Sequence, residues 1–398
     1  MLVLLLFACL PLVYYAAAID TARRYLRERS ARRRPEFTPP VSILKPVRGL
    51  DRRTLENFAS FCRQDYPVYE VLFAVADPDD PSVAVIRDLI ERVPDRSIRL
   101  VAGVPELGPS SKVNKLCRLA SEARYDLLVV SDSDISVPPG YLRAVAGPFR
   151  DAQVGAVTCL YHGVSDGSVA ADIEAMGIAT DFVAGVLVAR RLEGLTFTLG
   201  ATMATTRTCL EEIGGFEALI EFCADDFELG RRIAARGRRI ELADVVVSTE
   251  CAPAGFGDLL KHQVRWAVTL RHSRPFGFAG RLVAGYGLPW AVAVLALVRP
   301  AWIAWGYAIA YVTLRLALAW IAGWQVLGDP TVRRRCWLAP VHDALVFFVS
   351  VAAFFSNRIE WRGFRRRRRS RVLPRSGVRR VQPVAFARWN TRRGVVDR

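Results

Sequence analysis

The 398-residue sequence lacks the motifs that mark several common metal, disulfide and nucleotide sites. Its eight cysteines are scattered and include no Cys-x-x-Cys pair, so they predict neither a zinc site nor a disulfide framework. No Gly-x-Gly-x-x-Gly follows the first predicted strand, and no Walker A sequence is present, which argues against a dinucleotide-binding Rossmann site and a P-loop. We expect the cysteines to be reduced and mostly buried.

Charge is absent from residues 1–19, and a run of about 20 apolar residues is long enough to span a bilayer as a helix. A cleaved signal peptide would begin with a positive region, whereas here the arginines follow the apolar run. By the positive-inside rule, residues 23–34 stay in the cytoplasm. The sequence therefore predicts a transmembrane anchor at 1–20, a basic linker at 21–40 and a cytoplasmic domain after it.

The net charge of +16 comes largely from arginine clusters at 23–34 and 358–393, which flank the apolar ends of the chain. Beside a membrane, each basic residue near an anionic lipid surface contributes about 1 kcal/mol to binding. A basic chain is also typical of nucleic-acid binding, but no recognition motif accompanies this charge. We predict contacts with an anionic lipid surface and no nucleic-acid partner.

Between the apolar ends, strand-like and helix-like patterns alternate. Short apolar runs predict strands, and amphipathic stretches between them predict helices. This alternation is typical of a parallel, doubly wound α/β sheet. The predicted strands are 41–45, 71–76, 98–102, 127–131 and 154–158, and the predicted helices are 52–63, 82–92, 112–122 and 139–149.

Two carboxylates, Asp132 and Asp134, end the buried strand at 127–131. Ligands of open α/β sheets bind beyond the carboxyl ends of the strands, and paired carboxylates there are costly without a cation. A solvated Asp-Ser turn explains the pattern equally well by itself. A calcium loop fits poorly, because the sixth position from Asp132 is Val137 where glycine is needed. We favour a divalent metal that carries a diphosphate.

Acidic residues recur at two other predicted element ends. Asp77 directly follows the strand at 71–76, and it would face the same crevice as Asp132 if the two strands are neighbours. Asp225 and Asp226 open a predicted helix, where interaction with the helix dipole alone would explain them. A third acidic site after two at strand ends makes capping alone less convincing.

Three further features accompany the acids. Lys112 opens a predicted helix, where it would either reach a phosphate or be solvated. Gly200 lies in a β-like segment and permits close approach to a ligand. A helical stretch at 256–270 contains Arg265 and Trp266, a pair that is also common at membrane interfaces.

The C-terminal part of the chain contains three candidate membrane segments. The second of them includes Arg315. Four spans, counting the anchor, would place the basic tail outside, against the positive-inside rule, so we expect one segment to be re-entrant or interfacial. The three segments are 282–298, 301–322 and 338–355.

In this order, the motifs resemble the ceramide glucosyltransferase family, a membrane branch of the inverting glycosyltransferases with the GT-A fold. Bacterial enzymes that glycosylate hopanoids are similar too, and the full Asp-x-Asp favours a bacterial branch. The resemblance covers about residues 40–275 and continues more loosely to 361–363. The last family motif is Gln/Arg-x-x-Arg-Trp, and its first position here is His262. The matching stretches are 41–46, 76–81, 111–116, 131–137, 154–161, 214–219, 224–229 and 265–266.

The resemblance implies an inverting transfer from a UDP-sugar. Asp226 would take the proton from the acceptor hydroxyl, and Asp225 would orient or tune it. The implied donor and acceptor contacts are Asp77 at the uridine, Asp132 and Asp134 at the ribose, the diphosphate and Mg²⁺ or Mn²⁺, Arg265 at the diphosphate, Trp266 at the acceptor, and His262 as a hydrogen-bond donor.

The resemblance also implies a domain order and a location. We expect a cytoplasmic GT-A domain at 41–275, a membrane region at 276–357 and a basic tail at 358–398, in a bacterial inner membrane. The acceptor is a membrane lipid hydroxyl, either ceramide with UDP-glucose or bacteriohopanetetrol with an N-acetylglucosamine donor. A polyprenyl-phosphate sugar transferase, a processive polysaccharide synthase and a non-catalytic membrane scaffold are the alternatives.

Overall fold

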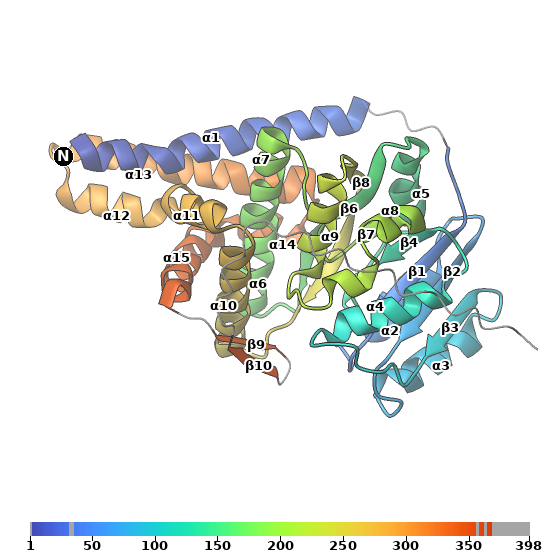
Figure 1. Cartoon of the computed structure of the whole chain (residues 1–398). Helices are drawn as coiled ribbons and strands as arrows, with labels where there is room; N and C mark the ends of the chain where they lie inside the picture. The colour runs from blue at the N-terminus through green and yellow to red at the C-terminus, as the bar shows by residue number, and fades with distance from the viewer. Residues whose placement is uncertain (1, 32–35, 356–357, 362–363, 368–398) are drawn as a thin grey trace, which may run out of the picture. The chain divides into compact units, whose positions relative to one another are not determined.

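The computed structural model describes residues 2–31, 36–355, 358–361 and 364–367 (Figure 1). The hairpin of β9 (Arg358–Trp361) and β10 (Phe364–Arg367) forms a separate unit with antiparallel pairing. Most of the predicted basic tail lies outside the described residues.

An eight-stranded sheet has the order β3-β2-β1-β4-β7-β6-β8-β5. The first four strands of this order are parallel, whereas β7 runs antiparallel to both β4 and β6. The predicted mostly parallel, doubly wound sheet is therefore confirmed. The strands are β1 (Val41–Pro46), β2 (Tyr69–Ala74), β3 (Ser97–Val101), β4 (Leu127–Val130), β5 (Ile135–Ser136), β6 (Val154–Ser165), β7 (Met203–Thr206) and β8 (Arg239–Cys251).

The central strand β4 is a continuous apolar run because both faces of the sheet are covered. In β1, Ile43 packs into the core beside α2 and α3, whereas its neighbour Leu44 packs into the core on the opposite face. Alternate residues of β4 divide between the two cores in the same way. Each fully buried aliphatic side chain contributes about 1.5–3 kcal/mol.

The helices around the sheet include those predicted from the sequence and three α-helices that were not, α6, α7 and α8. Of these, α6 and α7 are joined by the π-helical segment η2, and α7 packs against α1. The helical segments of this domain are α2 (Thr54–Cys62), α3 (Ser82–Arg92), α4 (Ser111–Glu122), α5 (Tyr141–Ala146), η1 (Gly147–Arg150), α6 (Val169–Gly177), η2 (Ile178–Phe182), α7 (Val183–Glu193), α8 (Arg207–Glu212), η3 (Phe216–Leu219) and α9 (Asp225–Ala235).

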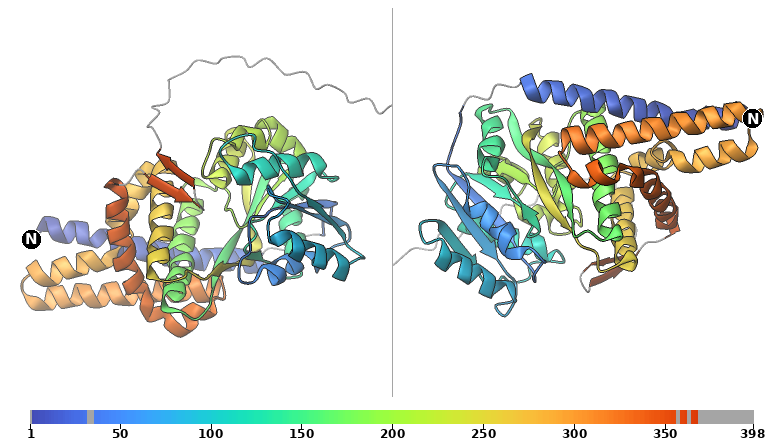
Figure 2. Two further views of the ribbon diagram at one scale, coloured as in Figure 1. Left: turned by 90° about the horizontal axis from the view of Figure 1, so that it is seen from below. Right: turned by 180° about the vertical axis from the view of Figure 1, so that it is seen from behind.

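Helix α1 (Leu2–Ala31) continues well past the predicted anchor, so the first part of the expected basic linker is helical. It runs side by side with α13, as three views show (Figures 1 and 2). The later helical segments are α10 (Phe256–Ser273), α11 (Pro275–Ala284), α12 (Gly287–Leu297), α13 (Ala301–Leu318), η4 (Ala319–Val326), α14 (Pro330–Arg335), η5 (Cys336–Leu338) and α15 (Ala339–Phe355).

Three described helical stretches are long and apolar enough to cross a membrane: Leu2–Ala31, Ala301–Val326 and Pro330–Phe355. The remaining predicted span corresponds to α11 and α12, which are bent by 41° at a short break. Alone, the 11 residues of α12 rise only about 16 Å, too short for a straight span. A bent pair of this kind is either a broken span or a re-entrant loop, so the predicted re-entrant or interfacial segment stays a prediction.

The apolar helices enclose a buried ion pair between Arg315 on α13 and Asp343 on α15. The guanidinium donates to both carboxylate oxygens, with Nη2–Oδ1 at 2.8 Å and Nε–Oδ2 at 2.9 Å. It also donates to Thr180 Oγ1 of η2 at 3.1 Å. The Tyr311 hydroxyl donates to Asp343 at 3.2 Å, and the Tyr15 hydroxyl of α1 lies 3.3 Å from the same carboxylate. This network joins three candidate spans to η2.

Candidate active site

Lysine 112 joins two of the acidic motifs predicted from the sequence. Its Nζ lies 2.8 Å from Asp132 Oδ1 and 3.0 Å from Asp225 Oδ2. Ser110 caps the start of α4 by accepting from the Val113 amide, and this places Lys112 in the first turn. Asp132 lies two residues after the end of β4, and Asp225 begins α9. Three separate segments therefore meet at one ammonium group.

The second carboxylate of the Asp-x-Asp motif, Asp134, is held by a residue of β8. The Thr249 hydroxyl of β8 donates to Asp134 Oδ2 at 2.9 Å. Burial, together with the nearby charge of Asp132, raises the Asp134 pKa to about 6. The raised pKa indicates that the surrounding cations do not fully compensate this negative charge.

Asp226 approaches the same site from the start of α9. Its Oδ1 accepts from the Phe227 amide at 2.7 Å, and Thr198 donates to its main-chain carbonyl at 2.7 Å. A Cβ placed on Gly200 would lie 3.2 Å from Asp132 Oδ2 and 3.3 Å from Asp226 Oδ2. Both carboxylates thus converge on a glycine, as expected for a segment that permits close approach.

Burial raises the pKa of Asp226 to about 6, and the neighbouring Asp225 charge adds to the effect. The Lys112 ammonium acts in the opposite direction. A carboxyl group with this pKa is ionised near neutral pH and is more basic than an exposed aspartate, which suits a proton acceptor.

Lys45 is a site residue that the sequence reasoning missed. It is the second-to-last residue of β1, is fully buried, and donates through Nζ to the main-chain carbonyl of Asp132. The ammonium also lies 3.9 Å from the centre of the Phe61 ring. Burial lowers its pKa to about 7, although Asp134 and Asp132 favour the charged form. A lysine inside a predicted buried strand was the available signal.

Asp77 lies farther along the sheet edge. Its strand, β2, does not neighbour β4 directly, because β1 lies between them. The Asp77 side chain is exposed and accepts from the Asp79 amide at 3.0 Å. Asp80, in contrast, accepts from the Gly49 amide at 2.8 Å and from Ser82, so it supports the turn, as a Pro/Asp turn predicts.

The last motif lies on α10, whose main packing partners are α15, α11 and α6. His262 Nδ1 is 3.1 Å from Glu174 Oε1 of α6, and the Trp266 side chain is exposed. Arg265 is partly exposed on the same helix. The structure therefore places these three residues beside the apolar helices. The acids Asp132 and Asp225, in contrast, lie around Lys112.

The described residues contain no group of three or more His, Cys, Asp or Glu side chains arranged to hold a metal ion. Asp132 and Asp134 offer two carboxylates. Magnesium commonly binds through one or two carboxylates and takes its other ligands from phosphate and water. The undercompensated charge of Asp134 fits such a cation, so this donor set suits a metal that arrives with a diphosphate.

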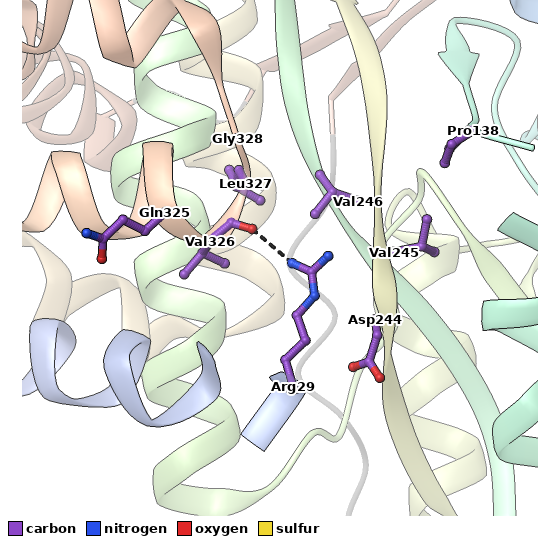
Figure 3. A pocket seen from close by; sticks show the side chains of 9 residues that line it. All are labelled: Arg29, Pro138, Asp244, Val245, Val246, Gln325, Val326, Leu327 and Gly328. Atoms are coloured by element: carbon purple, nitrogen blue, oxygen red, sulfur yellow. Dashed lines mark hydrogen bonds between the residues drawn. The ribbon is translucent and has the colours of Figure 1, made fainter. Parts of the chain in front are cut away.

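A pocket of about 390 Å³ lies elsewhere, where the end of α1, β8 and the end of η4 meet (Figure 3). The Arg29 side chain extends toward Val326, and its Nη1 donates to the Val326 carbonyl at 3.1 Å. None of the acids or lysines described above lines it. Its lining residues are Arg29, Pro138, Asp244, Val245, Val246, Gln325, Val326, Leu327 and Gly328.

Solved structures with a similar fold include the mannosyltransferase PcManGT from Pyrobaculum calidifontis in complex with GDP-Man and Mn²⁺. The TM-score is 0.54 at 19% identity, over 88% of this chain and 99% of that chain. This likeness confirms the predicted GT-A fold.

Sequence relatives include ceramide glucosyltransferase 1 of Caenorhabditis elegans, 28% identical over 200 residues, which are 50% of this chain and 43% of the relative. The ceramide glucosyltransferase of Candida albicans is 33% identical over 113 residues, 25% of this chain and 21% of the relative. The chain spans less than half the length of either relative. It matches the glycosyl transferase family 21 over residues 3–371. The chain therefore belongs to glycosyl transferase family 21.

Proposed function

We propose that this protein is an inverting, membrane-bound glycosyltransferase that moves a sugar from a UDP-sugar to the hydroxyl group of a membrane lipid. The observation that supports this most is the bridge from Lys112 to Asp132 and Asp225. It brings the acids assigned to the donor next to the acids assigned to the acceptor, so both substrates would meet at one site.

On the donor side, Asp132 and Asp134 would hold a divalent cation with the diphosphate. A bound Mg²⁺ or Mn²⁺ would supply charge stabilisation for the leaving UDP. Lys112 would contact a phosphate, because its ammonium already lies 2.8 Å from Asp132. Asp77 would bind the uridine from the exposed end of the neighbouring strands, and Arg265 would contact the diphosphate.

On the acceptor side, Asp226 would take the proton from the lipid hydroxyl as that oxygen attacks the anomeric carbon. Asp225 would bind Lys112 and would also raise the proton affinity of Asp226. This matches the direction of the Asp226 pKa shift. A single displacement of this kind inverts the anomeric carbon. An α-linked donor would then give a β-linked glycolipid.

The apolar helices make a lipid acceptor physically reasonable. A lipid stays in the bilayer, so its hydroxyl must be presented at the interface, and α10 directly precedes the broken pair α11 and α12. The exposed Trp266 and the nearby His262 would contact the acceptor or its entry. We place the domain at 41–275 in the cytoplasm of a bacterial cell, with the arginine clusters on anionic lipid.

The acceptor class is proposed from the relatives, whose names describe ceramide glucosyltransferases. Ceramide with UDP-glucose is the first pair to test, and bacteriohopanetetrol with UDP-N-acetylglucosamine is the second. These pairs differ in both sugar and lipid, so a single product analysis separates them.

The test is transfer of label from each radiolabelled UDP-sugar in membranes that contain the full chain. Lipids are extracted after incubation with ceramide, bacteriohopanetetrol or polyprenyl phosphate, and the labelled product is identified by mass spectrometry. We expect label in a ceramide or hopanoid glycolipid, and none with an Asp226→Asn variant. Label in polyprenyl phosphate or in a polymer would contradict the acceptor, and no transfer to any lipid would favour a membrane scaffold.

A further inference from the structure

The ammonium of Lys112 contacts one of the two carboxylates that are proposed to hold the metal ion. It contacts Asp132 at 2.8 Å and Asp225 at 3.0 Å, and these carboxylates belong to different motifs. The Lys112 side chain is 14% exposed, so it is largely enclosed and yet open on one side. A cation that binds Asp132 would therefore meet another positive charge within contact distance.

The second lysine of the site, Lys45, has less freedom to move when a cation binds. Lys45 is completely buried, donates to the Asp132 carbonyl and lies against the Phe61 ring. Lys112, in contrast, extends from the first turn of α4 on a flexible four-carbon stem with three rotatable N–H donors. Of the two ammonium groups, Lys112 is the one placed to change partners.

We propose that Lys112 is the resident counter-ion of the donor-free site and makes binding of the divalent cation depend on the nucleotide. The inference rests on the proposed donor site. Without nucleotide, the ammonium and the metal compete for Asp132, and their like charges repel. With nucleotide, a diphosphate oxygen offers the ammonium a new anionic partner, so Lys112 leaves Asp132 to the metal without becoming unpaired.

This exchange has a quantitative consequence. If the nucleotide strengthens metal binding, the metal strengthens nucleotide binding by the same factor, and such factors are typically about 5–150-fold. The wild-type protein should therefore bind Mn²⁺ weakly alone and at least about tenfold more tightly with UDP. Removing the ammonium should strengthen Mn²⁺ binding in the absence of UDP and weaken the coupling.

The experiment is a Mn²⁺ titration of the purified full-length protein in detergent, with and without saturating UDP. The free Mn²⁺ signal in electron paramagnetic resonance reports binding without any need for turnover. Lys112→Met removes the charge and keeps the aliphatic stem, whereas Lys112→Arg keeps the charge. Lys261→Met is the matched control, because Lys261 is exposed on α10 and pairs with Asp258.

We expect Lys112→Met to bind Mn²⁺ more tightly than wild type without UDP and to lose most of the coupling, whereas Lys112→Arg and Lys261→Met retain it. Equal coupling in wild type and Lys112→Met would overturn the inference. Wild-type binding of Mn²⁺ that is unaffected by UDP would also overturn it but leave the proposed donor site intact. Absence of Mn²⁺ binding even with UDP would overturn the metal site itself.

Discussion

Two charge clusters in this molecule are built in opposite ways. Among the apolar helices, one guanidinium and one carboxylate pair directly, Arg315 with Asp343, and hydroxyl groups complete the network. At the sheet edge, carboxylates outnumber ammonium groups, and two of the carboxyl pKa values are raised to about 6. The members of this second cluster are Asp132, Asp134, Asp225, Asp226, Lys45 and Lys112.

This difference in charge balance distinguishes a structural ion pair from a binding site. A buried ion pair that is matched one to one has little residual charge to offer a ligand, and losing one partner leaves an uncompensated ion. In a cluster with excess negative charge, repulsion between the carboxylates destabilises the folded protein. A cation that arrives with the substrate relieves this repulsion.

Asp226→Asn should lower glycosyl transfer by about 10²–10⁴-fold, because the amide does not accept the hydroxyl proton. Donor binding should stay within about threefold of wild type, since Asp226 is assigned to the acceptor side. Radiolabel transfer and calorimetric UDP binding measure the two effects. Asp79→Asn, on the exposed turn after β2, is the control, and a parallel loss of UDP binding would argue against Asp226 as the base.

Asp343→Asn should destabilise the helical region by about 3–5 kcal/mol, because Arg315 then lies buried without its counter-ion. The measurement is thermal unfolding in detergent, followed by circular dichroism. A paired Arg315→Met/Asp343→Leu variant removes both charges and should be clearly more stable than Asp343→Asn. If the double variant were less stable than Asp343→Asn, Arg315 and Asp343 would not act as a structural ion pair.

Asp134→Ala should weaken metal-dependent UDP binding by about 10–100-fold while leaving the fold intact. The reason is that the excess negative charge of the Asp-x-Asp motif is what the cation compensates. Titration of UDP with and without EDTA measures the effect, and EDTA should lower binding to wild type far more than to the variant. Unchanged wild-type activity in EDTA would show that the metal assignment is wrong.

The raised pKa of Asp226 predicts an acid limb in the pH profile. The base works only when ionised, so kcat/KM should be constant above about pH 7, halved near pH 6, and fall about tenfold for each lower pH unit. UDP affinity measured over the same pH range distinguishes Asp226 from Asp134, whose pKa is similar. A loss of UDP affinity at acid pH would be assigned to Asp134, because that carboxylate is on the donor side. A profile flat down to pH 5 would contradict the assignment.

The parallel part of the fold was predictable because buried strands are short apolar runs and the helices between them are amphipathic. The first four strands begin and end within two residues of their predicted positions. The pair α6 and α7 was missed because most of its residues between 170 and 187 are buried, which removes the one-sided pattern that marks a surface helix.

The candidate site was predictable as a set of residue types and element ends, but its geometry was not. That Lys112 would bridge Asp132 and Asp225 depends on where α4 and α9 begin relative to β4. Lys45 escaped notice because a lysine near the end of a strand is usually solvated, and its burial against Phe61 is visible only in the structure. The positions of His262 and Trp266 depend on how α10 packs against α6 and α15.

In the proposed mechanism one base, Asp226, assists a single displacement on a UDP-sugar. The most direct test is the anomeric configuration of the labelled glycolipid, read from the coupling constant of the anomeric proton by NMR. An α-linked UDP-sugar should give a β-linked product. An α-linked product would contradict the account, because retention requires a mechanism other than a single attack assisted by Asp226.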